Sequence, residues 1–128
     1  MDIINRKDIP AFIAPGRKRW AAMGAGGAAI RIDDANVGFA RVSLEYGPME
    51  PHKHINEILY VLDAKDAYVR YGDTKACEKK QPLSPGDVFR MRDGEWHVFE
   101  FENPDGFLEI LTFFASASYE VTTASQEE

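Results

Sequence analysis

The chain has 128 residues, of which 45% are hydrophobic, enough for one hydrophobic core and too few for two independent domains. Acidic residues outnumber basic ones by 21 to 15, for a formal net charge of -6, which argues against nucleic acid or an anionic membrane as a partner because both attract clustered Lys and Arg. The single cysteine, Cys77, excludes an intrachain disulfide. With neither a secretory signal nor an apolar run of the roughly 20 residues that span a bilayer, we expect a cytoplasmic protein.

Proline and glycine divide the chain into many short segments. In the first 36 residues we expect loops, with one helical turn near residues 9–13, and we interpret the basic run Arg17-Lys18-Arg19 as a solvated loop. From Val37 onward, alternating or continuous apolar runs between turns predict strands. The predicted ranges are 37–46, 57–63, 66–71, 75–81, 88–91, 96–102 and 107–115. Many short strands with regular turns predict an all-β sandwich or barrel.

Two segments carry more specific expectations. The run Glu57 to Asp63 is apolar, β-branched and aromatic, which is typical of a strand buried on both faces. Residues 116–128 are rich in Ser, Ala, Thr and Glu, and this composition predicts a flexible tail without a role in function.

The chain has three histidines, and their placement indicates a metal site. His52 and His54 lie two residues apart, so on an extended strand both imidazoles point to the same face. Glu57 begins the apolar run, where an unpaired carboxylate is costly to bury, and His97 lies on the strand predicted for 96–102. Three neutral imidazoles and a carboxylate suit a divalent Mn, Fe, Co, Ni or Zn ion. The alternative for His52 and His54 is a pair of surface histidines, and for Glu57 a carboxylate paired with Lys53.

Two motifs containing these residues resemble those of the cupins. The first reads Gly47-Pro-Met-Glu-Pro-His52-Lys-His54-Ile-Asn-Glu57 and continues as a hydrophobic strand to Ala64. The second begins with the turn Pro85-Gly86-Asp87 and reaches Gly94-Glu-Trp-His97, with Asn103 beyond it. This sequence departs from the family pattern at Ala64, where glycine is usual, at Arg92, where proline is usual, and in its longer spacing to Asn103.

The resemblance implies a double-stranded β-helix, the jelly-roll-like cupin barrel, as a single domain over residues 1–115 with its motif core at 47–103. It also implies one divalent metal ion near a mouth of the barrel, with His52, His54, Glu57 and His97 as ligands.

Other side chains are candidates for a pocket or an interface. By strand parity, Leu59, Phe99 and Phe101 share the metal-facing side and are predicted to form the pocket wall, although such residues more often serve as core. We interpret three further arginines as solvated rather than as a clamp for an anion: Arg41, Arg90 and Arg92. Three apolar residues point outward from the strand at 57–63, namely Ile58, Tyr60 and Leu62. Because they need cover, they predict a homodimer.

The motifs suggest a metalloenzyme that acts on a small oxygen-rich molecule such as a sugar or keto acid, by isomerase, lyase or dioxygenase chemistry. No general base besides the ligands is evident, and Tyr46, Tyr60 and Glu50 are weak candidates for that role. The alternative is a module that binds or senses a small molecule, with a metal that is structural or orients the ligand. A barrel without metal is the third reading, which the complete ligand set disfavours.

Overall fold

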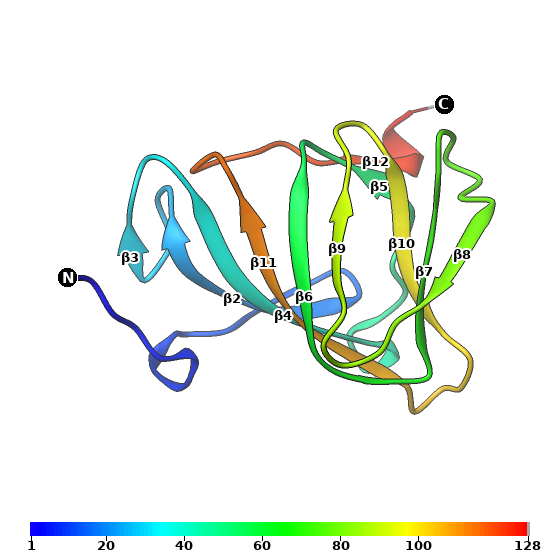
Figure 1. Cartoon of the computed structure of the whole chain (residues 1–128), viewed down its shortest axis with the longest axis horizontal. Helices are drawn as coiled ribbons and strands as arrows, with labels where there is room; N and C mark the ends of the chain where they lie inside the picture. Colours follow the sequence, from blue (N-terminus) through cyan, green and yellow to red (C-terminus); the bar gives the residue numbers. More distant parts are fainter. Residues whose placement is uncertain (128) are drawn as a thin grey trace.

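The computed structural model describes residues 1–127 and shows an all-β chain built from two sheets (Figure 1). The larger of two hydrophobic clusters lies between the sheets. The seven-stranded sheet has the order β1 (Phe12–Ala14), β2 (Arg17–Gly24), β4 (Asn36–Ser43), β11 (Phe107–Phe114), β6 (Glu57–Lys65) and β9 (Val88–Met91), with β3 (Ile30–Arg31) beside β2. The five-stranded sheet has the order β12 (Thr122–Thr123), β5 (His52–Lys53), β10 (Trp96–Phe101), β7 (Ala67–Gly72) and β8 (Lys79–Pro82). All pairs are antiparallel except β2 with β3.

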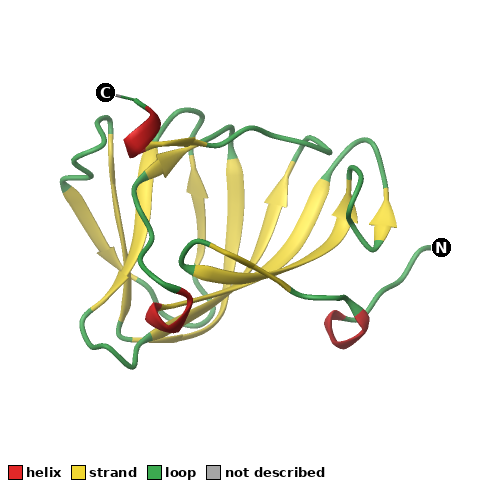
Figure 2. Ribbon diagram, turned by 180° about the vertical axis from the view of Figure 1, so that it is seen from behind, coloured by secondary structure: helices red, strands yellow, loops and turns green. Residues whose placement is uncertain are grey.

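Helical structure within residues 1–127 is confined to three short 3₁₀ turns (Figure 2): η1 (Arg6–Asp8), η2 (Leu44–Tyr46) and η3 (Ala124–Gln126). None of these described helices is long and apolar enough to cross a membrane. The core draws on both sheets, because Leu59, Val61, Leu108 and Ile110 come from the larger sheet and Val69 and Phe99 from the smaller one. The prediction of an all-β fold is thus confirmed.

The strand predicted for residues 37–46 ends early, at Ser43. The Ser43 hydroxyl accepts a hydrogen bond from the Glu45 backbone N–H, 3.2 Å away, which caps the η2 turn. Because the strand parity is lost there, Leu44 is exposed instead of continuing the buried face formed by Ala40 and Val42.

The first 36 residues differ from the expectation of loops. Phe12 to Ala14 form a strand where a helical turn was expected, and the basic run Arg17 to Arg19 opens β2 rather than a solvated loop. The reason is that β2 pairs with β4 along its length, with Arg17 opposite Val42 and Arg19 opposite Ala40. This pairing places both arginines on the inner face, since cross-strand partners share a face.

Strand β6 is buried on one face only, which corrects the prediction of burial on both. Glu57, Leu59 and Val61 are buried. The residues that alternate with them are exposed: Ile58 by 45%, Tyr60 by 41% and Leu62 by 40%. The cause is that only the inner face of β6 packs on the core between the sheets, while its outer side chains stay exposed among residues 1–127.

The segment after β11 differs from the flexible tail predicted for residues 116–128. The Asn36 side chain donates a hydrogen bond to the Ala117 carbonyl, 3.1 Å away, and Thr122 and Thr123 pair with β5. Tyr119 stacks on Phe114 with ring centroids 3.8 Å apart. These contacts return the chain across one end of the barrel; Glu128 lies outside the described residues.

Candidate metal centre

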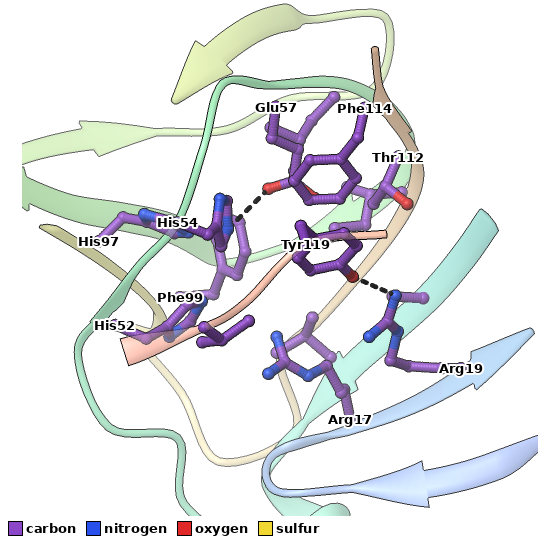
Figure 3. A pocket seen from close by; sticks show the side chains of 15 residues that line it. Arg17, Arg19, His52, His54, Glu57, His97, Phe99, Thr112, Phe114 and Tyr119 are labelled. Carbon is purple, nitrogen blue, oxygen red and sulfur yellow. Dashed lines mark hydrogen bonds and ion pairs between the residues drawn. The ribbon is translucent and has the colours of Figure 1, made fainter. Parts of the chain in front are cut away.

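The three histidines converge in one pocket (Figure 3). His52 on β5 is the cross-strand partner of His97 on β10, and His54 follows β5 directly. Their candidate ligand atoms all lie within 4.8 Å of one another. His52 and His97 are 4% and 1% exposed, and the His54 side chain is 5% exposed. The alternative of two surface histidines is therefore wrong.

Backbone carbonyls orient all three rings. The Nδ1 atoms of His52, His54 and His97 lie 3.0, 2.7 and 3.1 Å from the carbonyl oxygens of Glu50, Ile55 and Glu95. A carbonyl oxygen only accepts a hydrogen bond, so a neutral ring there carries its proton on Nδ1 and leaves a lone pair on Nε2. The same arrangement fixes the orientation of histidines that bind metals.

The His97 Nε2 atom is buried and has no hydrogen-bond partner within residues 1–127. A buried polar atom without a partner is costly to a fold, and here it lies beside two other imidazoles whose Nε2 lone pairs are free by the same tautomer argument. A divalent ion of the Mn to Zn series would satisfy all three lone pairs. The donor set thus fits a metal.

Burial keeps the rings of His52 and His97 neutral. It lowers the pKa of His52 to about 4, with a smaller contribution from the Arg17 and His54 charges. Burial also moves the pKa of His97 well below its ordinary value, and the neighbouring His52 and His54 lower it further. Near pH 7 both imidazoles therefore carry no proton on Nε2 and can act as ligands.

Glu57 stands next to the histidine cluster. It is the first residue of β6 and is 7% exposed, and its Oε1 lies 3.4 Å from the His54 Nε2. The alternative of a Glu57–Lys53 pair is not observed, since the Lys53 Nζ lies 3.1 Å from a Glu127 carboxylate oxygen instead. The structure thus brings three of the four candidate ligands together and places the carboxylate of the fourth beside His54.

A small pocket opens onto the cluster, with a cavity volume of about 40 Å³, room for about three water molecules. Leu59 and Phe99 line it, as strand parity predicts. Phe101 does not line it and packs against the core instead. Its side chain is on the expected face, but it lies four residues beyond His97, roughly 13 Å along the strand at 3.3 Å per residue.

Several residues of this pocket were not predicted from the sequence. Arg17 and Arg19 enter from β2, Thr112 and Phe114 from β11, and Tyr119 from the segment after β11 (Figure 3). A strand prediction over residues 17–24 would have put both arginines on one face, but no sequence signal marks Tyr119. None of Arg41, Arg90 and Arg92 lines the pocket; Arg41 instead pairs with Glu109, with a separation of 3.1 Å.

No family model and no curated protein matches this sequence, but solved structures match nearly all of the chain. The polyketide cyclase RemF from Streptomyces resistomycificus is 20% identical with a TM-score of 0.73, over 97% of this chain and 85% of that one. The oxalate decarboxylase of Lactobacillus farciminis, in complex with formate, is 16% identical with a TM-score of 0.69 over 94% of this chain. The protein has the cupin fold.

The chain spans about a third of the length of the oxalate decarboxylases that it matches. The chain spans 35% of the Lactobacillus farciminis oxalate decarboxylase chain. A Bacillus subtilis oxalate decarboxylase described for its Mn(II) centres is 17% identical with a TM-score of 0.71, and the match covers 94% of this chain and 31% of that one. The sequence resemblance to cupins is confirmed at the level of the fold.

Proposed function

We propose that this cupin binds one divalent transition metal ion per chain and is a small metalloenzyme acting on a small oxygen-rich molecule. His52, His54 and His97 would hold the ion, with Glu57 as the fourth ligand. The observation that carries the proposal is the cluster of three buried imidazoles with candidate ligand atoms within 4.8 Å, one of which, His97 Nε2, has no partner in residues 1–127.

The bound ion would supply Lewis-acid or redox chemistry toward a carbonyl, carboxylate or hydroxyl oxygen, as isomerases, lyases and dioxygenases require. The chain itself would orient the ligands through the Nδ1–carbonyl contacts and limit water with an apolar wall of Leu59, Phe99 and Phe114. The Mn(II) centres named for the Bacillus subtilis decarboxylase support Mn as one candidate, beside Fe, Co, Ni and Zn.

A binding or sensing module is the alternative, and the small pocket favours it. A cavity of about 40 Å³ leaves little room for a substrate to change shape during a reaction. In addition, none of the weak general-base candidates Tyr46, Tyr60 and Glu50 lines this pocket. In such a module the metal would be structural or would orient a ligand that leaves unchanged.

One experiment separates the two functions. The protein is loaded in turn with Mn, Fe, Co, Ni and Zn, incubated with a panel of keto acids and sugars, and followed by proton NMR. Turnover by one metal form, absent from a His52→Ala/His97→Ala variant, supports the enzyme. Saturable binding in the loaded protein without any new product supports the sensing module.

We also propose a homodimer that covers the outer face of β6. The exposed side chains of Ile58, Tyr60 and Leu62 lie there. Beside them are two more exposed apolar side chains on the neighbouring strands: Val88 on β9, which is 66% exposed, and Phe113 on β11, which is 37% exposed. A contiguous apolar patch of this kind is characteristic of protein–protein contacts. Cytoplasmic localisation stays a prediction.

A further inference from the structure

The pocket contains an arginine that the proposed metal site does not use. Arg17 faces inward from β2, and its Nε atom is buried without a hydrogen-bond partner. Within residues 1–127 the Arg17 side chain forms no ion pair either, whereas Arg6, Arg41 and Arg70 each bind a carboxylate. A buried guanidinium nitrogen without a partner is costly, which indicates that a ligand completes it.

The neighbouring arginine is already engaged. An Nη atom of Arg19 donates to the Tyr119 hydroxyl, 2.9 Å away, and the Tyr119 ring stacks on Phe114. Figure 3 shows both arginines on the side of the pocket opposite His54 and Glu57. Arg19 therefore positions Tyr119 at the mouth of the pocket, and Arg17 is the one with donors to spare.

The charges of the pocket require an anion. Glu57 is the only acidic residue among those that line it, against Arg17 and Arg19, and a divalent ion on three neutral imidazoles would add further positive charge. The two arginines also disfavour each other: burial, and next the charge of Arg19, lower the pKa of Arg17. A negatively charged ligand would relieve both the repulsion and the missing hydrogen bonds.

We propose that the Arg17 guanidinium binds the carboxylate of a small planar acid and directs the rest of that molecule toward the histidine cluster. A carboxylate suits Arg17 because two parallel N–H donors of a guanidinium match its two oxygens. A guanidinium also binds phosphate in this way, so inorganic phosphate is the competing ligand in the test. The orientation toward the cluster rests on the proposed function, whereas the contact between Arg17 and the carboxylate does not require a metal.

The NMR resonance of the Arg17 Nε–Hε group tests the contact between this guanidinium and a carboxylate directly. In ¹H–¹⁵N NMR of the metal-free full chain, pyruvate should shift this resonance in a saturable way, and its uncharged analogue pyruvamide should not. Arg17→Lys keeps the charge but loses the fork of donors, so pyruvate should bind about tenfold more weakly or worse. Lys18→Gln is the matched control, because Lys18 pairs with Arg41 on the outer face of the same strands, and its affinity should not change.

Other outcomes would overturn the assignment: equal pyruvate affinity in Arg17→Lys, equal binding of pyruvamide, or tighter binding of inorganic phosphate than of pyruvate. Arg17→Met guards against misfolding, since removing a half-buried, unpaired charge should leave the melting temperature unchanged or higher. Metal content is measured on the same variants. A loss of pyruvate binding with full metal content isolates Arg17, whereas absent metal with intact pyruvate binding refutes only the proposed metal function.

Discussion

His52 and His97 are cross-strand partners between β5 and β10, and their rings meet edge to face with centroids 4.4 Å apart. Strand β5 is only two residues long, so this pairing, with β12 on its other side, holds the first histidine motif against the second. The candidate metal centre therefore depends on a short segment whose position is set by two neighbouring strands.

Purified protein without an affinity tag should contain near one equivalent of a divalent transition metal per chain, and His52→Ala/His97→Ala should contain almost none, because two of three clustered imidazoles are lost. Mass spectrometry of the metal measures both. Glu78→Gln is the control, since Glu78 is exposed and lies outside the pocket. Wild-type protein that stays free of metal after reconstitution would refute the site.

Glu57→Gln should weaken metal binding without abolishing it. The carboxylate is 3.4 Å from His54 Nε2, and loss of a ligand or of a group that orients a ligand typically costs about 10- to 100-fold in affinity. Competition with a chelator measures the change, and Glu45→Gln, at an exposed position on η2, is the matched control. Unchanged affinity would exclude Glu57 from the centre.

The metal-free protein should lose stability as the pH falls from 7 toward 4. Burial lowers the pKa of His52 to about 4 in the folded state, against about 6.5 in the unfolded chain. Between these values the unfolded state binds more protons, so acid favours unfolding, by roughly 3 kcal/mol for this residue alone. Urea unfolding at several pH values measures the slope, and His52→Gln should reduce it. An identical slope in that variant would contradict the assignment.

Tyr119→Ala should destabilise the fold and loosen the mouth of the pocket. The variant loses the stack on Phe114 and the hydrogen bond from Arg19, together about 1–2 kcal/mol of unfolding free energy. Tyr119→Phe retains the stack and should lose about 1 kcal/mol or less. Denaturant unfolding compares the two, with Val121→Ala as a control in the same segment. Equal stability of all forms would show that this segment is not docked in solution.

The dimer is tested by light scattering. Wild-type protein at micromolar concentration should have twice the mass of the chain, and Tyr60→Lys should be monomeric, because a charge on the outer face of β6 disrupts an apolar contact. Lys18→Gln, on the outer face of β2, should remain dimeric. A monomeric wild-type protein would refute the proposed homodimer.

Much of the fold follows from local pattern. From residue 57 onward most strands lie within a residue or two of their predicted ranges, and β9 at Val88–Met91 matches its range fully. The histidine motif predicted the convergence of His52 and His54, because two residues on an extended segment share a face whatever surrounds them. The faces of Leu59 and Phe99 were predicted for the same reason.

Distances between strands were decided only by the tertiary structure. Parity puts Phe101 on the correct face but does not say that the pocket ends at Phe99, and the basic run at Arg17 reads as solvated until β4 is placed beside it. Tyr119 reaches the pocket through its stack on a ring five positions earlier, in a segment with no strand pattern. Alternation along a strand is set by the local backbone, whereas strand pairing and chain return are set by burial of the whole core, which no single segment encodes.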